Sequence, residues 1–297
     1  MLGAIWGASY LLIKIGIRDL SSSMVAWARI ALAAAVLVPL ATRASALGPA
    51  WRRGGGYLVA LGAIQVAGPF LLIAAAEQEI ASGLAGTLVA SAPLFTALLA
   101  IRLDAEERSS GSRLVGLLTG LLGVAILLGL DLSGSFAELA GGLAVLAAGL
   151  GYAIGGFMVK RRFAGVAPVG VAAWVMVAST VLLLPAAIAT APAEAPGLGP
   201  LGAVFALGVV GTGIAFAIFY DLMSTVGPAR TFIVTYLAPG FAVLYGALFL
   251  DEAITAAIVG GLALILAGSW LAAGGGQRRA AAHDGPAAGP VPAHTES

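Results

Sequence analysis

Ten apolar segments, each about as long as the hydrocarbon core of a bilayer is thick, follow one another along this chain of 297 residues. They span residues 2–20, 24–42, 56–76, 82–101, 113–130, 140–159, 167–189, 198–220, 229–250 and 254–273. Hydrophobic residues make up 60% of the chain and charged residues only 10%, against about 25% charged in a soluble domain. The sequence therefore predicts an all-α polytopic membrane protein. It excludes a soluble globule, a disordered chain and a nucleic-acid binder.

Several kinds of chemistry have no residues to support them. The chain has no cysteine, and both histidines, His283 and His294, lie close to the C-terminus. Disulfides, thiolate metal sites and histidine catalysis within the membrane are therefore excluded. No helix centre carries an aspartate or glutamate, so a buried proton relay is not expected, and no GxxxxGK[ST] motif indicates an ATPase. We expect no cofactor and no metal.

The lysines and arginines are distributed unevenly among the connections. If the N-terminus is cytoplasmic, 12 of them lie inside and only Lys14 and Arg18 lie outside, with Arg29 within the second helix. Cytoplasmic connections carry an excess of Lys and Arg. The bias predicts an integral protein of the cytoplasmic membrane with both termini inside.

The two halves of the chain match each other at an offset of 146 residues. At this offset, rare residues coincide: Lys14 with Lys160, Pro39 with Pro185, Pro93 with Pro239, and Glu106 with Glu252. The sequence thus predicts a first five-helix half at residues 1–130, a second at 140–273, and a disordered cytoplasmic tail at 274–297. Because five is an odd number, the halves would be inverted relative to each other, a 5+5 arrangement typical of secondary transporters with alternating access.

The residues resemble those of a known family. WGASYLLIKIGI near the start, Arg29, and SAPLFTALLA followed by Glu106 are similar to EamA-type permeases of the drug/metabolite transporter superfamily, and the second half repeats the pattern with GYAIGGFMVK and YLAPGFAVLYGALFLDEAIT. The resemblance implies ten helices and export or uptake of metabolites, amino acids or drugs, without implying one substrate. Val175 occupies the position that corresponds to Arg29, so any role of this arginine is not symmetric.

Three residues within the predicted helices could shape or line a cavity. Pro93 and Pro239 lie inside the fourth and ninth segments, where proline kinks a helix, and we expect these kinks to shape a cavity. A charged side chain such as that of Arg29 is costly to bury at membrane depth, and two explanations of its presence there remain open. Its side chain either extends to the interface or binds an anionic group such as a carboxylate.

Further polar and aromatic residues could line a cavity for an amphipathic solute. Lys14 shares a helix face with Tyr10, four residues earlier. The other candidates are Trp6, Gln65, Ser91, Tyr152 and Tyr236. For each one alone, an interfacial belt or a hydrogen bond between helices is the simpler explanation. Glu77 and Glu79 are expected to be solvated at the outer end of the third helix, and Glu106 and Glu252 to be structural.

The sequence favours a secondary transporter, a permease or exporter, for a small organic solute such as a metabolite, amino acid or drug. The alternatives are a membrane-embedded enzyme and a non-transporting membrane scaffold or channel. An enzyme is disfavoured because Ser91 and Ser179 have no base at comparable depth. The expected partners are the solute and the lipid bilayer, with no nucleic acid. Monomer and homodimer both remain open.

Overall fold

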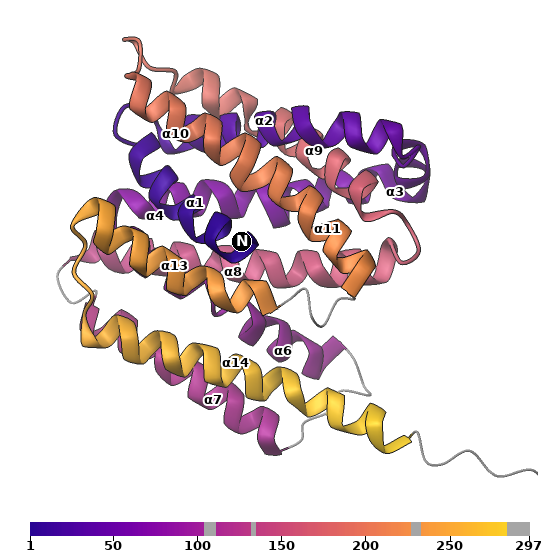
Figure 1. Cartoon of the computed structure of the whole chain (residues 1–297), viewed down its shortest axis with the longest axis vertical. Helices are drawn as coiled ribbons and strands as arrows, with labels where there is room; N and C mark the ends of the chain where they lie inside the picture. Colours follow the sequence, from indigo (N-terminus) through magenta and orange to yellow (C-terminus); the bar gives the residue numbers. More distant parts are fainter. Residues whose placement is uncertain (104–110, 132–134, 227–232, 284–297) are drawn as a thin grey trace, which may run out of the picture.

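The structure is a computed structural model that describes residues 1–103, 111–131, 135–226 and 233–283, and all regular elements within these residues are helical (Figure 1). The first half contains α1 (Leu2–Gly16), α2 (Ser22–Arg43), α3 (Leu47–Leu61), η1 (Gly62–Ala67), α4 (Gly68–Glu79), α5 (Ser82–Val89), α6 (Ala92–Leu103), α7 (Gly111–Ile126) and η3 (Leu127–Asp131). The second half contains α8 (Phe136–Arg162), α9 (Pro168–Ala189), α10 (Leu198–Gly208), η4 (Val209–Ile214), α11 (Ala215–Val226), α13 (Ile233–Leu250) and α14 (Ala256–His283). The elements η1, η3 and η4 are π-helical turns.

Ten apolar helical segments are present in the described residues, the number that the sequence predicts. Seven helical segments are long and apolar enough to cross a membrane. Three shorter apolar helices, Leu2–Gly16, Val234–Leu250 and Ala256–Ala272, account for the rest. Local signals in the sequence start several of these helices. The hydroxyl oxygens of Ser21 and Ser135 accept hydrogen bonds of 3.1 Å from the backbone N–H groups of Met24 and Glu138 and cap α2 and α8.

The third predicted span is longer than its apolar run. Its helical residues extend from Leu47, through an extended backbone at Gly54 and through η1, to Glu79. The fourth span is interrupted at Ala90 and Ser91, and Pro93 is the second residue of the new helix α6. Pro93 has no N–H to continue the preceding helix. Pro93 thus lies at an interruption within the fourth span, Ser82–Ile101, whereas Pro239 lies inside the uninterrupted helix α13.

The last helix passes the predicted end of the final membrane segment. Helix α14 continues to His283, so the first residues of the segment expected to be disordered from residue 274 are helical. After three glycines, this stretch continues with Gln277, two arginines and three alanines, which are good helix formers. Residues 284–297 and the connection that contains Glu106 lie outside the described residues.

The helices pack side by side in the arrangement of Figure 1. Helix α2 lies along α9 at one side of the molecule, α7 lies along α14 at the opposite side, and α1, α4, α8 and α13 lie between these pairs. Small residues allow the backbones to come close. A Cβ atom added to Gly116 of α7 would lie 2.6 Å from the backbone nitrogen of Ala272 in α14. Van der Waals packing of this kind holds helices together where lipid replaces water.

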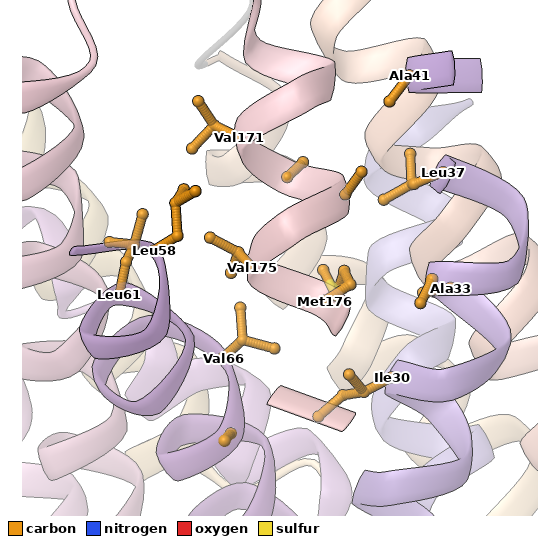
Figure 2. Packing of buried hydrophobic residues seen from close by; sticks show 14 of the residues in the cluster. Ile30, Ala33, Leu37, Ala41, Leu58, Leu61, Val66, Val171, Val175 and Met176 are labelled. Carbon is orange, nitrogen blue, oxygen red and sulfur yellow. The ribbon is translucent and has the colours of Figure 1, made fainter. Parts of the chain in front are cut away.

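An apolar cluster fixes the position of α2 (Figure 2). Ile30 and Leu37 of α2 face Met176 of α9, while Leu58 and Leu61 of α3 close the other side. All five side chains are 0–1% exposed. Buried side chains of this size make many small dispersion contacts, so the cluster is a rigid support. It holds the helix turn that carries Arg29, the residue directly before Ile30.

Candidate functional site

Arg29 lies inside the helix bundle. Its side chain is 8% exposed, and it is seven residues from the start of α2, which is about 10 Å at the rise of an α-helix. Its Nε donates a hydrogen bond of 2.8 Å to the hydroxyl of Thr212. Its guanidinium carbon lies 3.8 Å from the centre of the Phe70 ring, a cation–π arrangement. The guanidinium therefore contacts groups inside the protein and does not extend to the interface.

The π-helical turn η4 supplies the partner of Arg29. The Thr212 hydroxyl donates to the carbonyl of Leu207, five residues earlier, at 2.9 Å. It thereby satisfies a carbonyl in the wider turn and leaves its lone pairs for Arg29. Turns of this type are uncommon and occur frequently at functional sites. Another such turn, η1, contains Gln65.

Arg29 keeps unused hydrogen-bonding capacity. A guanidinium has five N–H donors, and Nε is the only one with a hydrogen-bond partner among the described residues. The four N–H groups on the two terminal nitrogens are those that bind carboxylate or phosphate in a bidentate pair. The site is thus a buried cation that is positioned by Thr212 and Phe70 and has its terminal donors available.

Two tyrosines and an acid lie within electrostatic range of this cation. Arg29 interacts electrostatically with Tyr152 of α8, Tyr10 of α1 and Glu77 of α4. Tyr10 and Tyr152 both pack into the apolar cluster between α1, α4 and α8. The structure therefore brings together three of the residues proposed from the sequence, Arg29, Tyr10 and Tyr152, and adds Glu77.

The expectation that Glu77 is solvated is wrong. Its side chain is 0% exposed, whereas Glu79 on the same helix is exposed. The reason is helical spacing: because α4 continues to Glu79, Glu77 falls on the face of Phe70 and Ile73, which packs against the bundle. Among the described residues, neither carboxylate oxygen of Glu77 has a hydrogen-bond partner.

Lys14 lies beside Glu77 and bonds to its backbone. The Lys14 ammonium donates to the carbonyl oxygens of Glu77 and Ile80, the latter at 2.9 Å. These carbonyls are at the end of α4, where no further turn of helix satisfies them. Lys14 therefore caps α4 and also places a positive charge near the Glu77 carboxylate.

A second carboxylate holds the start of the next helix. Glu252, between α13 and α14, accepts hydrogen bonds of 2.7 and 2.9 Å from the backbone N–H groups of Ser82 and Gly83, and one of 3.0 Å from the Ser82 hydroxyl. Free N–H groups and the helix dipole make a helix start a favourable place for a carboxylate. The structural role predicted for Glu252 is consistent with these bonds.

A pocket opens beside these residues. It has a volume of about 530 Å³ and lies at the ends of α1, α4 and α13. Its lining residues are Lys14, Ile17, Arg18, Glu77, Gln78, Ala81, Leu250 and Glu252. Glu77 belongs to its wall although its own side chain is sealed from solvent. Among the described residues, no group of three or more His, Asp or Glu side chains is arranged to hold a metal ion.

Of the remaining candidates, Trp6, Gln65 and Ser91 contact residues other than Arg29. Trp6 packs against Phe216 and Phe219, with ring centroids 6.1 and 5.2 Å apart. Gln65 packs on Gly155, where an added Cβ would lie 2.6 Å from the Gln65 Cβ. The Ser91 hydroxyl donates to the carbonyl of Leu88 at 2.7 Å, which is a local structural bond. Tyr236 is partly buried in α13.

The sequence did not predict that Thr212 and Phe70 contact Arg29, or that Glu77 is buried. Thr212 lies 183 residues from Arg29, and nothing in the local sequence indicates that they meet. The signal for Glu77 was present, since Phe70, Ile73 and Glu77 have the spacing of one helix face.

In the described part of the chain, seven helices are long and apolar enough to cross a membrane and three shorter helices are apolar, which is typical of an integral membrane protein. The model of the EamA-like transporter family matches residues 1–129 and 139–274, so the chain belongs to this family and is a membrane transporter by class.

Known relatives agree with this class. The chain is 29% identical over 245 residues to an uncharacterized inner membrane transporter, YedA, of Escherichia coli K12, which covers 82% of this chain and 78% of the relative. It is 25% identical over 269 residues to an uncharacterized transporter of Archaeoglobus fulgidus, covering 90% and 94%. A crystal structure with 23% identity superposes with a TM-score of 0.62 over 94% of this chain and 98% of the other, which supports the fold.

Proposed function

We propose that this protein is a secondary transporter that carries a small organic solute with a carboxylate group across the inner membrane by alternating access. The observation that carries the proposal is Arg29, a buried guanidinium whose terminal N–H groups have no partner among the described residues. A carboxylate would form a bidentate pair with these groups and offset the loss of hydration. The rings of Phe70, Tyr10 and Tyr152 around it suit the apolar part of such a solute.

Corresponding contacts in the two halves support an inverted repeat. A Cβ added to Gly62 would lie 3.2 Å from the Cβ of Ala178 and 3.2 Å from the carbonyl oxygen of Val175. A Cβ added to Gly208 would lie 2.6 Å from the Cβ of Leu32 and 3.0 Å from the carbonyl oxygen of Arg29. Each residue of the first set becomes its counterpart in the second when 146 is added or subtracted. The third helix of each half thus approaches the second helix of the other half in the same way.

A second pair of contacts follows the same rule. Gly155 approaches Gln65, and Gly211 approaches Ser9, with an added Cβ 3.2 Å from the serine hydroxyl. These pairs too are related by the offset of 146, and the π-helical turns η1 and η4 occupy nearly matching positions. In transporters with inverted repeats, interrupted helices near the repeat interface form the substrate site. Arg29 meets η4 at this interface.

The family match and the position of Arg29 favour transport over the alternatives. An enzyme would need an activated nucleophile. The hydroxyls of Ser91 and Ser179, the serines considered for this role, donate to backbone carbonyls at 2.7–3.0 Å. We infer an inner-membrane location because a relative that the chain matches over 82% of its length carries that description.

Counterflow in proteoliposomes tests the proposal with three solutes that share one skeleton. Phenylalanine is a zwitterion, N-acetylphenylalanine is an anion, and phenylalaninamide is a cation. We expect exchange of the two carboxylates and not of the amide, after subtraction of leakage into protein-free liposomes. Arg29→Gln should lose exchange of the carboxylates. Arg29→Lys, which keeps the charge without the planar fork, should lose less.

Two results would contradict the proposal. One is exchange of the amide at the same rate as the carboxylates, because Arg29 would then not select the charge. The other is the absence of exchange for all three solutes by protein that is folded, as measured by its cooperative thermal unfolding.

A further inference from the structure

Glu77 has no role in binding the carboxylate, yet it is the most unusual acidic residue of the described part of the chain. It is 0% exposed, and neither of its carboxylate oxygens has a hydrogen-bond partner. An ionised carboxylate without partners is among the most costly groups to bury. An ionisable side chain within a membrane segment suggests a functional site.

Groups of both charge signs interact electrostatically with Glu77. Glu77 interacts electrostatically with Lys14 of α1, with Glu252, which comes before α14, and with Arg29 of α2. It also interacts with Tyr10 of α1. Lys14 uses two of its three N–H donors on the carbonyls at the end of α4. The carboxylate of Glu252 already accepts hydrogen bonds from the backbone N–H groups at the start of α5. Arg29 is therefore the neighbouring charge that a bound solute would change.

The position of Glu77 links the pocket to the interior. It forms part of the wall of the 530 Å³ pocket together with Lys14 and Glu252. It also interacts electrostatically with Arg29, which lies about 10 Å along α2 from that end of the bundle. Glu77 therefore belongs both to the pocket wall and to the electrostatic surroundings of Arg29.

We propose that Glu77 is a proton-binding site whose occupancy is coupled to an anion on Arg29, an inference that rests on the proposed function. In the binding step a proton from a water-borne hydronium ion in the pocket forms an O–H bond with the carboxylate, and in release it returns to water. An anion on Arg29 cancels the positive charge that favours the ionised carboxylate, so the anion favours protonation of Glu77. Linkage is reciprocal, and proton and anion therefore bind together and move in the same direction.

Infrared spectroscopy of the purified full-length protein in lipid tests proton binding without any solute. As the pH is stepped, a protonated carboxyl group gives a C=O stretching band that its carboxylate lacks. We expect a band from Glu77 that is absent in Glu77→Gln and retained in Glu79→Gln, the matched control with an exposed carboxylate on the same helix. If Glu77→Gln fails to fold, Glu77→Asp keeps a carboxyl group in a new environment and should move the band in frequency.

The coupling has its own test in the same spectra. Arg29→Gln imitates an arginine whose charge has been neutralised, so at one fixed pH its Glu77 band should be larger than in the wild type. An unchanged band in Glu77→Gln, or an unchanged band size in Arg29→Gln, would overturn the inference. Counterflow of the phenylalanine series judges the transport function separately, because exchange needs no net proton movement. Proteoliposomes that exchange no solute while the Glu77 band is present would contradict the proposed function and leave the proton site in place.

Discussion

A hydrogen bond of 2.8 Å from Nε of Arg29 to Oγ1 of Thr212 joins α2, in the first half of the chain, to the π-helical turn η4, in the second half. It fixes the orientation of the guanidinium against the Phe70 ring. It also means that any movement of the halves relative to each other changes the environment of this charge. The bond is therefore both a structural link and part of the proposed solute site.

Thr212→Val removes the hydroxyl and keeps the shape of the side chain. It leaves Nε of Arg29 without a partner, and a buried donor without a partner costs about 1–3 kcal/mol of stability. We expect lower thermal stability of the purified protein by about this amount. Thr96→Val is the control, because Thr96 is exposed and bonds only to the carbonyl of Ala92 in its own helix. Equal losses for the two variants would show that the link to Arg29 contributes nothing.

The bonds of Glu252 at the start of α5 predict a second effect on stability. Glu252→Ala removes the acceptor of three hydrogen bonds, and we expect a loss of about 1–3 kcal/mol in the free energy of unfolding. Glu252→Gln keeps the shape of the side chain and one acceptor oxygen, and it should lose less. Asp251→Asn is the matched control, since Asp251 is exposed and asparagine tolerates its left-handed backbone of φ 55°. A loss in the control as large as in Glu252→Ala would argue against the capping role.

Most of the fold could be predicted from the sequence because a membrane makes strong demands. Each span must be apolar and long enough, and most of the predicted segments match helices of the described residues within a few residues. The third helix begins earlier than predicted, and the eighth and tenth end later. Pro93 predicted a kink in the fourth span, but the sequence alone did not indicate a full break of the helix. The break depends on local backbone bonds at Ala90 and Ser91 that hydropathy does not report.

The site was predictable only in part. Arg29 stands out in the sequence because a charge at membrane depth is rare. Its partner Thr212 is one ordinary threonine among several, and only the packing of the two halves selects it. Glu77 was predicted to be exposed to solvent because the predicted apolar segment ends at residue 76. A single further turn of α4 turns its side chain into the bundle.

The corresponding glycines of the third and eighth spans predict unequal tolerance. At Gly208 an added Cβ would lie 2.6 Å from the Cβ of Leu32, so Gly208→Ala must displace α2, whereas at Gly62 the contacts of 3.2 Å need only a small adjustment. We expect Gly208→Ala to lower the unfolding temperature more than Gly62→Ala. Gly202→Ala meets open space and should be neutral or stabilising by up to about 1 kcal/mol.

These three variants also bear on the site. A Cβ atom added to Gly208 would lie 3.0 Å from the backbone oxygen of Arg29. Gly208→Ala should therefore reduce counterflow by more than its effect on the amount of folded protein explains. If Gly62→Ala proves the more harmful of the two, the close approach of α10 to α2 does not limit the packing as the distances indicate.

The Lys/Arg distribution predicts which side of the membrane the pocket faces. The connection between α9 and α10 lies at the same end of the bundle as the pocket, because the backbone N–H of Gly197 donates to Asp19 at 2.8 Å and Arg18 lines the pocket. Glu194 in this connection and Arg53 in α3 are both exposed. The chain has no native cysteine, so a single introduced cysteine reports its own position.

With 12 basic residues predicted inside against two outside, an impermeant thiol reagent added to intact bacterial cells should label Glu194→Cys and spare Arg53→Cys. Both variants should be labelled once the cells are permeabilised, which shows that each thiol is reactive. This pattern would mean that Lys14, Glu77 and Glu252 face the outside through the pocket, so that the proton for Glu77 comes from there. Labelling of Arg53→Cys with protection of Glu194→Cys would reverse the orientation, and the same pocket would then take its proton from the cytoplasm.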